Sequence, residues 1–311
     1  MLGCRRGGQG AYETMPFYEF EAQQEALSFL EQSAEVRRWR QFETALCAEL
    51  VGHERVRMRG FCLACERPRQ FEVDRQFGAI DHGDGRWEPN WRERMVCPGC
   101  GLNSRQRAIA VAARQIAEAG SDRRRAIYVT ERIGPLYVWL SSNLAVADLT
   151  GSEFLSEKEG ASGLVAELRD CVQHQDLEHL DFESRSFDGI VCNDVLEHVN
   201  EPLRCLEEMA RVLRPGGKAL ITVPLAIGLD RSVRRARSTD GDVVFLQSPR
   251  FHGDPLSEAG ALVYHDFGWD LVHSFRECGF ASASLVVYWS YLFGYVGVPQ
   301  FYLRAEVAPE A

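Results

Sequence analysis

The chain has 311 residues, of which 45% are hydrophobic and 26% charged, proportions that are ordinary for a soluble globular protein. Its formal net charge of -10 at pH 7 argues against a protein that coats nucleic acid. No stretch approaches the roughly 18 uninterrupted apolar residues of a membrane span. The charged N-terminus also lacks the apolar segment of a signal peptide. We therefore expect a cytoplasmic protein with one large α/β domain and an appendage.

The N-terminal region is predicted to be an appendage of residues 1–60, with helices over 18–32 and 34–51. In the second helix, apolar residues recur at helical spacing from Val36 through Trp39 to Leu50. Such a stripe is typical of a core-facing or interdomain surface, and we expect nothing more specific of it.

Residues 61–102 contain two cysteine pairs, each with two residues between its members: Cys62 with Cys65, and Cys97 with Cys100. Four thiolates at about 2.3 Å form a closed tetrahedral zinc site. Because paired cysteines in a reducing compartment are more often metal ligands than disulfides, we expect a structural zinc ion here. The intervening loop of 31 residues is longer than in common zinc fingers, and two disulfides are the alternative.

Polar residues flank these cysteines on both sides. Either they line a cleft against the following domain, or they form a solvated, ion-paired surface. They are Asn90, Arg92, Arg94, Arg105 and Arg107.

The third region, residues 103–311, begins with a predicted helix over 104–118, for which Ser104 is the expected N-cap. Short apolar runs then alternate with helical segments, the pattern of a mostly parallel sheet with helices on both faces. A polar insertion over 225–270 interrupts this pattern, and we expect it to be a lid or substrate-binding segment. A final helix and two strand-like runs follow.

The most specific signal is DLEHLDFESRSFDGIVCNDVLEHV, followed by RVLRPGGKALITVP. This sequence resembles the type-11 branch of class I S-adenosylmethionine (SAM)-dependent methyltransferases, over roughly residues 104–224. The resemblance implies a Rossmann-like, doubly wound sheet with SAM at the carboxyl ends of its strands. Asn193 and Asp194 follow the buried strand GIVC and are therefore expected beside the cofactor and the transferred methyl group.

Two further positions follow from the resemblance. Asp176 and Leu177 match the family's adenine-binding position, although a loop-capping role for Asp176 is the alternative. The family's Gly-rich first loop is replaced by TERIGP, in which Gly134 is the one glycine. This loop suits no pyrophosphate. Pro135 fits the first turn of a helix, whose N–H groups can meet the methionyl carboxylate, and Glu131 can meet the amine.

An acidic residue at the end of the second strand is expected to bind the ribose hydroxyls. We assign this role to Glu153, with Asp148 as the alternative because the strand boundary is uncertain from sequence.

Two histidines with adjacent carboxylates lie in the insertion, at FHGD and YHDF. We expect His265, or failing that His252, to be the general base, with Asp266 or Asp254 fixing its tautomer. His198 is the rival, although its LEHV context is more typical of scaffold.

The predicted function is methyl transfer from SAM to a small molecule or glycan, at oxygen or nitrogen. An RNA methyltransferase that uses the zinc knuckle for binding is one alternative. The other is a non-catalytic binding protein on the same fold. The sequence does not predict the oligomeric state.

Overall fold

The computed structural model describes residues 17–119, 123–155, 168, 171–239, 242–254 and 256–310. The chain divides into two compact units. The first comprises residues 1–112 and 284–302, and the second comprises residues 113–283 and 303–311. Residues 162–170, part of the predicted alternation of short apolar runs and helical segments, lie almost entirely outside the described residues.

Four parallel strands form the centre of the second unit: β7 (Arg125–Val129), β8 (Ala147–Glu153), β10 (Phe187–Asn193) and β11 (Leu213–Thr222). They lie in the order β11-β10-β7-β8. The short β9 (Gln173–His174) continues the sheet beyond β8 in parallel, and the end of β19 (Tyr295–Glu306) pairs antiparallel with β11. All seven residues of β10 are buried, including Asp188 and Asn193, and its apolar run GIVC is typical of a central strand.

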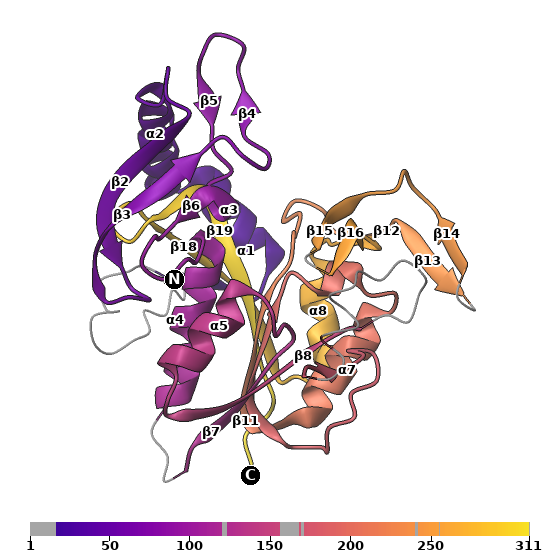
Figure 1. Ribbon diagram of the computed structural model, residues 1–311. Helices are drawn as coiled ribbons and strands as arrows, with labels where there is room; N and C mark the ends of the chain where they lie inside the picture. The colour runs from indigo at the N-terminus through magenta and orange to yellow at the C-terminus, as the bar shows by residue number, and fades with distance from the viewer. Residues whose placement is uncertain are drawn as a thin grey trace. The chain divides into compact units, whose positions relative to one another are not determined.

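Helices cover both faces of this sheet (Figure 1). They include α5 (Pro135–Asn143) on one face, with α7 (Pro202–Val212) and α8 (Asp270–Glu277) on the other. Pro135 occupies the first turn of α5, where its missing N–H costs nothing. The predicted Rossmann-like, doubly wound, mostly parallel architecture is therefore confirmed.

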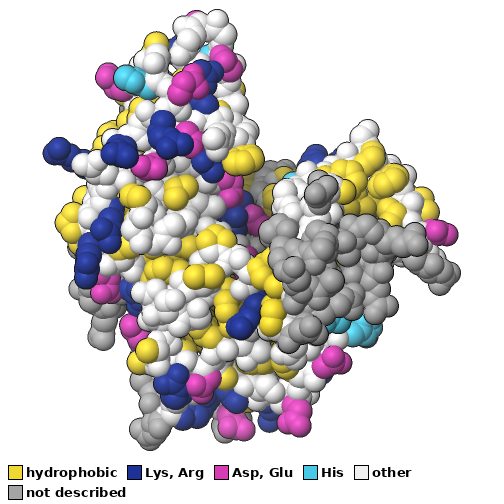
Figure 2. Space-filling model, in the orientation of Figure 1, with side chains coloured by type: hydrophobic (Ala, Val, Ile, Leu, Met, Phe, Trp, Pro, Cys, Tyr) yellow, Lys and Arg dark blue, Asp and Glu magenta, His cyan; other side chains and the backbone are white. Residues whose placement is uncertain are grey.

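The insertion contains more structure than its sequence suggested. It folds into three short antiparallel pairs, in which β12 pairs with β17, β13 with β14 and β15 with β16. Their bounds are Val233–Arg234, His265–Asp266, Ala236–Thr239, Asp242–Phe245, Phe251–Asp254 and Ser257–Leu262. Exposed apolar residues gather on the β12–β14 region, including Val244, Phe245 and Leu246 (Figure 2).

The first unit begins with β1 (Phe17–Phe20), which pairs with β18 (Ser282–Ser290), followed by α1 (Gln23–Gln32) and α2 (Ala34–Ala48). The helix predicted over 18–32 thus starts later, because its first residues join a sheet edge. The predicted stripe of α2 is core: the Trp39 ring stacks on the Trp289 ring, with centroids 5.4 Å apart.

A small sheet carries the cysteine pairs of the first unit. Its strands are β2 (Arg55–Cys62), β3 (Arg67–Asp74) and β6 (Met95–Val96). The long connection after β3 holds β4 (Ile80–Asp81), β5 (Trp87–Glu88) and α3 (Trp91–Arg94). The predicted boundary after residue 60 falls inside β2, so the helical segment and the cysteine-rich segment belong to one compact unit.

Helix α4 has the predicted bounds, Ser104–Glu118, but a different cap. The Asn103 Oδ1 atom accepts the Gln106 N–H at 2.9 Å, and the Gln106 side chain accepts the Asn103 N–H at 3.2 Å. This reciprocal pair is a capping box, and it replaces the predicted Ser104 cap. Within the described residues, no helix is both long and apolar enough to cross a bilayer.

A buried carboxylate joins the amino-terminal ends of β7, β10 and β11. Asp188 is 6% exposed and accepts bonds from Arg125 (3.0 Å), Arg214 (2.9 Å) and the Ala126 N–H (2.8 Å), as well as from Arg123. Burial by itself would raise the pKa of Asp188, but these donors outweigh it and hold the pKa well below its usual range.

We predict that Asp188→Asn lowers the free energy of unfolding at pH 7 by about 2–4 kcal/mol, because the cations lose a charged partner. The contribution of the Asp188 carboxylate to the free energy of unfolding is complete above the pKa of about 3.9 that an aspartate has in the unfolded chain. It is lost as the pH falls toward the lower pKa of Asp188 in the folded protein. Urea unfolding of wild type and variant should therefore differ less as the pH falls below about 4. An equal difference at pH 7 and pH 3.5 would contradict this account.

Candidate active site and cysteine cluster

The predicted cofactor residues gather where the parallel strands of the second unit end. Glu153 is the last residue of β8 and Asn193 the last of β10, while Glu131 follows β7 by two residues. In open α/β sheets this carboxyl edge is where ligands bind. The topology also separates the two ribose candidates. Asp148 lies near the amino-terminal end of β8, where it pairs with Arg124 at 2.6 Å, so it is not at the strand end where the ribose-binding acid was expected.

Glu153 ties the end of β8 to the loop after β7. Its Oε1 atom accepts the backbone N–H groups of Arg132 at 2.6 Å and Ile133 at 2.9 Å. Burial raises the pKa of Glu153, although these two bonds oppose the shift. Glu153 therefore holds this loop against the end of β8, and the binding of a methionyl carboxylate by N–H groups of the first turn of α5 stays a prediction.

A polar network links the ends of β7, β10 and β11. The Asn193 amide donates to Glu131 at 3.3 Å, and its carbonyl oxygen accepts the Thr222 hydroxyl at 3.2 Å. The Thr222 hydroxyl in turn accepts the Asp194 N–H at 3.0 Å. Asp194 has a φ of 53°, in the left-handed region that is uncommon for residues other than glycine. Such backbone conformations cluster at functional sites.

The loop after β7 turns tightly over this network. A Cβ atom at Gly134 would lie 2.7 Å from the Glu131 carboxylate, so a side chain there would displace Glu131. The Tyr137 ring lies close against Gly151 in the same way, and the Arg132 guanidinium lies 4.7 Å from the centroid of that ring. The missing side chain of Gly134 therefore allows the backbone to lie close to the Glu131 carboxylate. The φ of Gly134 is -71°, which any residue can adopt.

Asp176 has the loop-capping contact that was its alternative interpretation. Its Oδ1 atom accepts the Glu178 N–H at 2.9 Å, and its other oxygen lies 4.0 Å from His179 Nδ1. Its side chain remains 43% exposed, and the adjacent Leu177 is buried. A capping carboxylate can still accept an exocyclic amine, so adenine binding by this pair stays a prediction.

The two histidines of the insertion lie in different clusters. His265 is buried, its ring stacks on Phe267, and its Nε2 atom lies 3.2 Å from the Asn200 carbonyl. Burial lowers the pKa of His265. Asp266, predicted to orient it, is instead held by Arg235 at 2.6 Å and by Arg250 at 2.7 Å. The role of His265 as base stays a prediction, without the carboxylate partner that motivated it.

His252 lies on β15 in a cluster with Glu197 and His198. These two residues belong to a short 3-10 turn (Leu196–His198) just beyond β10. Glu197 is 1% exposed and was not among the predicted site residues. The adjacency of a Glu–His pair to Asn193 and Asp194 was the available signal, but its burial and its approach to β15 are not visible in the sequence.

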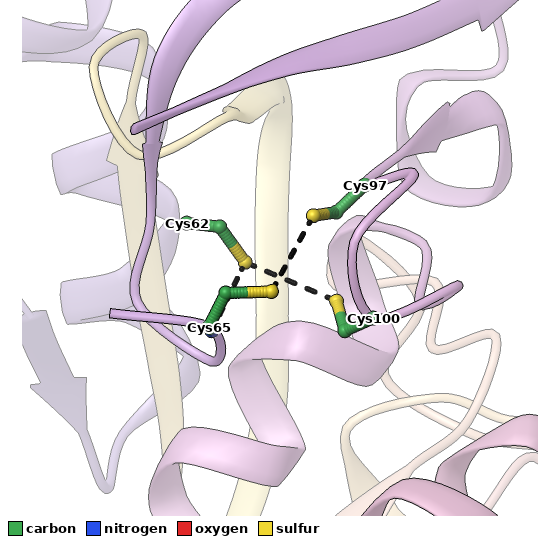
Figure 3. Close-up of side chains that lie close together, drawn as sticks. All are labelled: Cys62, Cys65, Cys97 and Cys100. Carbon is green, nitrogen blue, oxygen red and sulfur yellow. Dashed lines mark hydrogen bonds between the residues drawn. The ribbon is translucent and has the colours of Figure 1, made fainter. Parts of the chain in front are cut away.

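The four cysteines predicted to form one site do meet, in the first unit (Figure 3). Cys62 Sγ lies 3.9 Å from Cys100 Sγ, and Cys65 Sγ lies 3.8 Å from Cys97 Sγ. Zinc–sulfur bonds of about 2.3 Å in a tetrahedron place the sulfurs about 3.8 Å apart. All four are free thiols rather than disulfides. The long intervening loop is accommodated because β4, β5 and α3 fold within it.

The arginines that flank the cysteines make contacts inside the first unit. Arg94 binds Asp74 through two bonds of 2.7 and 2.6 Å, and Arg105 pairs with Glu93 at 3.0 Å. Arg107 is completely buried and donates to the Met95 carbonyl at 2.7 Å. The ion-paired interpretation therefore fits these side chains, and Arg107 does not line a cleft.

Comparison with known proteins finds sequence similarity within the second unit. Residues 137–221 match the family model described as "Methyltransferase domain". The Coxiella burnetii protein named ubiquinone biosynthesis O-methyltransferase is 44% identical over 46 residues, which are 15% of this chain and 20% of the relative. The chain thus spans about a fifth of the length of that relative.

Two more distant likenesses extend further along the chain. The 27-O-demethylrifamycin SV methyltransferase of Amycolatopsis mediterranei is 28% identical over 126 residues, 39% of this chain and 46% of the relative. A crystal structure of the Burkholderia thailandensis 1,6-didemethyltoxoflavin-N1-methyltransferase has 20% identity and a TM-score of 0.34. That match covers 65% of this chain and 79% of the other, and it is too distant to bear on function.

We predict that Glu153→Ala speeds amide hydrogen exchange at Arg132 and Ile133, because both N–H groups lose their acceptor. The local opening free energy should fall by about 1–3 kcal/mol. Asp148→Ala, on the same strand, is the matched control and should leave this loop unchanged. Unaltered exchange at both amides in Glu153→Ala would show that the loop does not depend on this carboxylate.

Proposed function

We propose that the chain is a SAM-dependent methyltransferase that acts on a small molecule or glycan. The observation that carries this proposal is the set of polar side chains at the carboxyl edge of the sheet, within a sequence that matches a methyltransferase domain. The curated relatives named above support a small-molecule acceptor, since their names specify a ubiquinone precursor and a rifamycin.

The hydrogen-bond acceptors at this edge of the sheet fit the polar groups of SAM. Glu131, Glu153 and Asp176 supply carboxylate oxygens, which suit an ammonium group, ribose hydroxyls and an exocyclic amine, respectively. Such an acidic set would repel a phosphate. When bound, SAM supplies a methyl group activated by its sulfonium charge. Asn193 and Asp194 would hold the methionyl end and the reacting methyl group close to the end of β10.

Catalysis then requires alignment, exclusion of water and, for a hydroxyl acceptor, removal of a proton. The β12–β17 insertion supplies both candidate bases, His252 and His265, and its aromatic residues would exclude water. Both residues remain proposals.

For the first unit we propose a structural zinc ion bound by Cys62, Cys65, Cys97 and Cys100. A site with four protein ligands has no open position for a substrate. The ion would join the β2–β3 turn to the segment that leads into α4. The Arg69 side chain, packed against Gly99 beside the cysteine cluster, would offset part of the negative charge of four thiolates.

An RNA acceptor is the alternative that one observation favours. Arg55, Arg57 and Arg59 are exposed at alternate positions of β2, next to the cysteine cluster. Arg57 pairs with Glu72, and the net charge of -10 opposes a broad electrostatic attraction. Binding of RNA that weakens steeply with added salt would favour this alternative.

We predict that the purified protein binds S-adenosylhomocysteine, and that Glu153→Ala weakens this binding by about 1–3 kcal/mol through loss of charge-assisted hydrogen bonds. Isothermal titration calorimetry measures both. Glu153→Gln should bind with intermediate affinity, since its amide oxygen still accepts the loop N–H groups. Asp148→Ala should bind as wild type. A wild-type protein that binds neither SAM nor S-adenosylhomocysteine would instead favour a non-catalytic binding protein.

We predict about one tightly held zinc ion per chain in protein made without added metal, measured by elemental analysis. Cys97→Ser should lose this zinc and unfold the small sheet, because metal binding and local folding are coupled. Cys171→Ser, an exposed cysteine outside the cluster, is the control. Recovery of disulfide-linked peptides that join these four cysteines, without metal, would refute the assignment.

A further inference from the structure

A second group of potential metal ligands lies at the carboxyl edge of the sheet. Glu197 and His198 follow β10, and His252 lies on β15 of the insertion. One ligand atom from each residue lies within 4.8 Å of the other two. The side chain of Glu197 is 1% exposed, that of His198 17% and that of His252 37%. The group is therefore buried at Glu197 and accessible to solvent at His252.

The distances in this group are wrong for hydrogen bonds and close to those of a shared ion. Glu197 Oε1 lies 3.8 Å from His198 Nε2 and 3.7 Å from His252 Nδ1, whereas an N–H···O bond is about 2.9 Å long. Two ligands at about 2.1 Å from one tetrahedral ion lie about 3.4 Å apart. The rings of the two histidines are almost perpendicular, at 87°, with centroids 5.0 Å apart.

The hydrogen bonding of His198 fixes which nitrogen faces the carboxylate. Its Nδ1 atom lies 2.8 Å from the Leu262 carbonyl oxygen, which can only accept, so Nδ1 carries the hydrogen. Nε2 is therefore the His198 nitrogen that remains to bind a ligand, and it lies on the side of the Glu197 carboxylate. Metal-binding histidines commonly donate their other N–H to a backbone carbonyl in this way.

We propose that Glu197, His198 and His252 bind a divalent cation. Two imidazole nitrogens and one carboxylate oxygen suit Zn²⁺, Mn²⁺ or Fe²⁺, and three protein ligands leave positions open. The role of this cation rests on the proposed methyl transfer: the open positions would take an oxygen of the acceptor, and the bound cation would make its hydroxyl more acidic. His252 would then be a ligand rather than the general base, and the released proton would pass to solvent. The acceptor would accordingly be an alcohol, an enol or a phenol rather than an amine.

The cation site is tested with Mn²⁺, because this hard ion prefers oxygen and nitrogen ligands and avoids the thiolate cluster. The full-length protein, with its zinc content measured first, is titrated with Mn²⁺ and the bound fraction is read by electron paramagnetic resonance. Wild type should bind about one Mn²⁺ per chain at this site. His252→Ala and Glu197→Gln should each weaken binding at least about tenfold. His273→Ala, an exposed histidine on α8, should bind as wild type.

Two results would overturn the proposal: no bound Mn²⁺ in wild type, or wild-type affinity in both ligand variants. The first would mean that Glu197 and the histidines form an ordinary ion pair. Near-ultraviolet circular dichroism checks that each variant is folded. If Glu197→Gln fails to fold because Glu197 is buried, the His252→Ala variant still tests the site. Binding of S-adenosylhomocysteine is measured separately, so a failure of the cation site and a failure of the methyltransferase proposal give different results.

Discussion

The parallel alignment of β7, β8, β10 and β11 is the constraint on which the site of the second unit depends. Parallel strands place all their carboxyl ends at one edge, so residues far apart in the chain become neighbours there. Asn193 thereby reaches Glu131, and Thr222 reaches both Asn193 and the backbone of Asp194. Antiparallel pairing of any of these strands would carry its terminal side chain to the opposite edge.

The two edges of this sheet use carboxylates in opposite ways. At the amino-terminal edge, arginines surround Asp188 and hold its pKa well below the usual range, so its charge stabilises the fold. At the carboxyl edge, burial raises the pKa of Glu153, and only part of its hydrogen-bonding capacity is used by the loop. A half-buried carboxylate whose hydrogen-bonding capacity is only partly used by its own chain is suited to bind a ligand with several hydrogen-bond donors.

The first unit depends on a different interaction, the buried guanidinium of Arg107. This group donates to the carbonyls of Met95 and Leu102, and also to that of Gly294, and it lies 4.4 Å from the centroid of the Phe71 ring. It therefore joins α4, the small sheet and the end of the β18–β19 connection around one charge. The four cysteines lie beside this centre, where a bound ion would add a second fixed junction.

The sequence by itself determined the features that depend on local order along the chain. Alternating strands and helices predicted the doubly wound sheet, and the paired spacing of Cys62, Cys65, Cys97 and Cys100 predicted that their thiols would meet. The position of Glu153 at a strand end, reinforced by the family resemblance, placed it at the ligand edge. The helix of α4 was predicted to the residue, because its apolar periodicity and its polar N-terminus are both local signals.

The tertiary structure decided the features that depend on burial and on contacts distant in sequence. The sequence placed His265 and His252 in one insertion and ranked His265 first, yet the β12–β17 and β15–β16 pairs carry the two residues to different partners. Glu197 was not recognised, because nothing local shows that its carboxylate is buried against a histidine more than fifty residues away. Spacing can predict that neighbours in sequence share a site, but the environment of a charge depends on every element that packs against it.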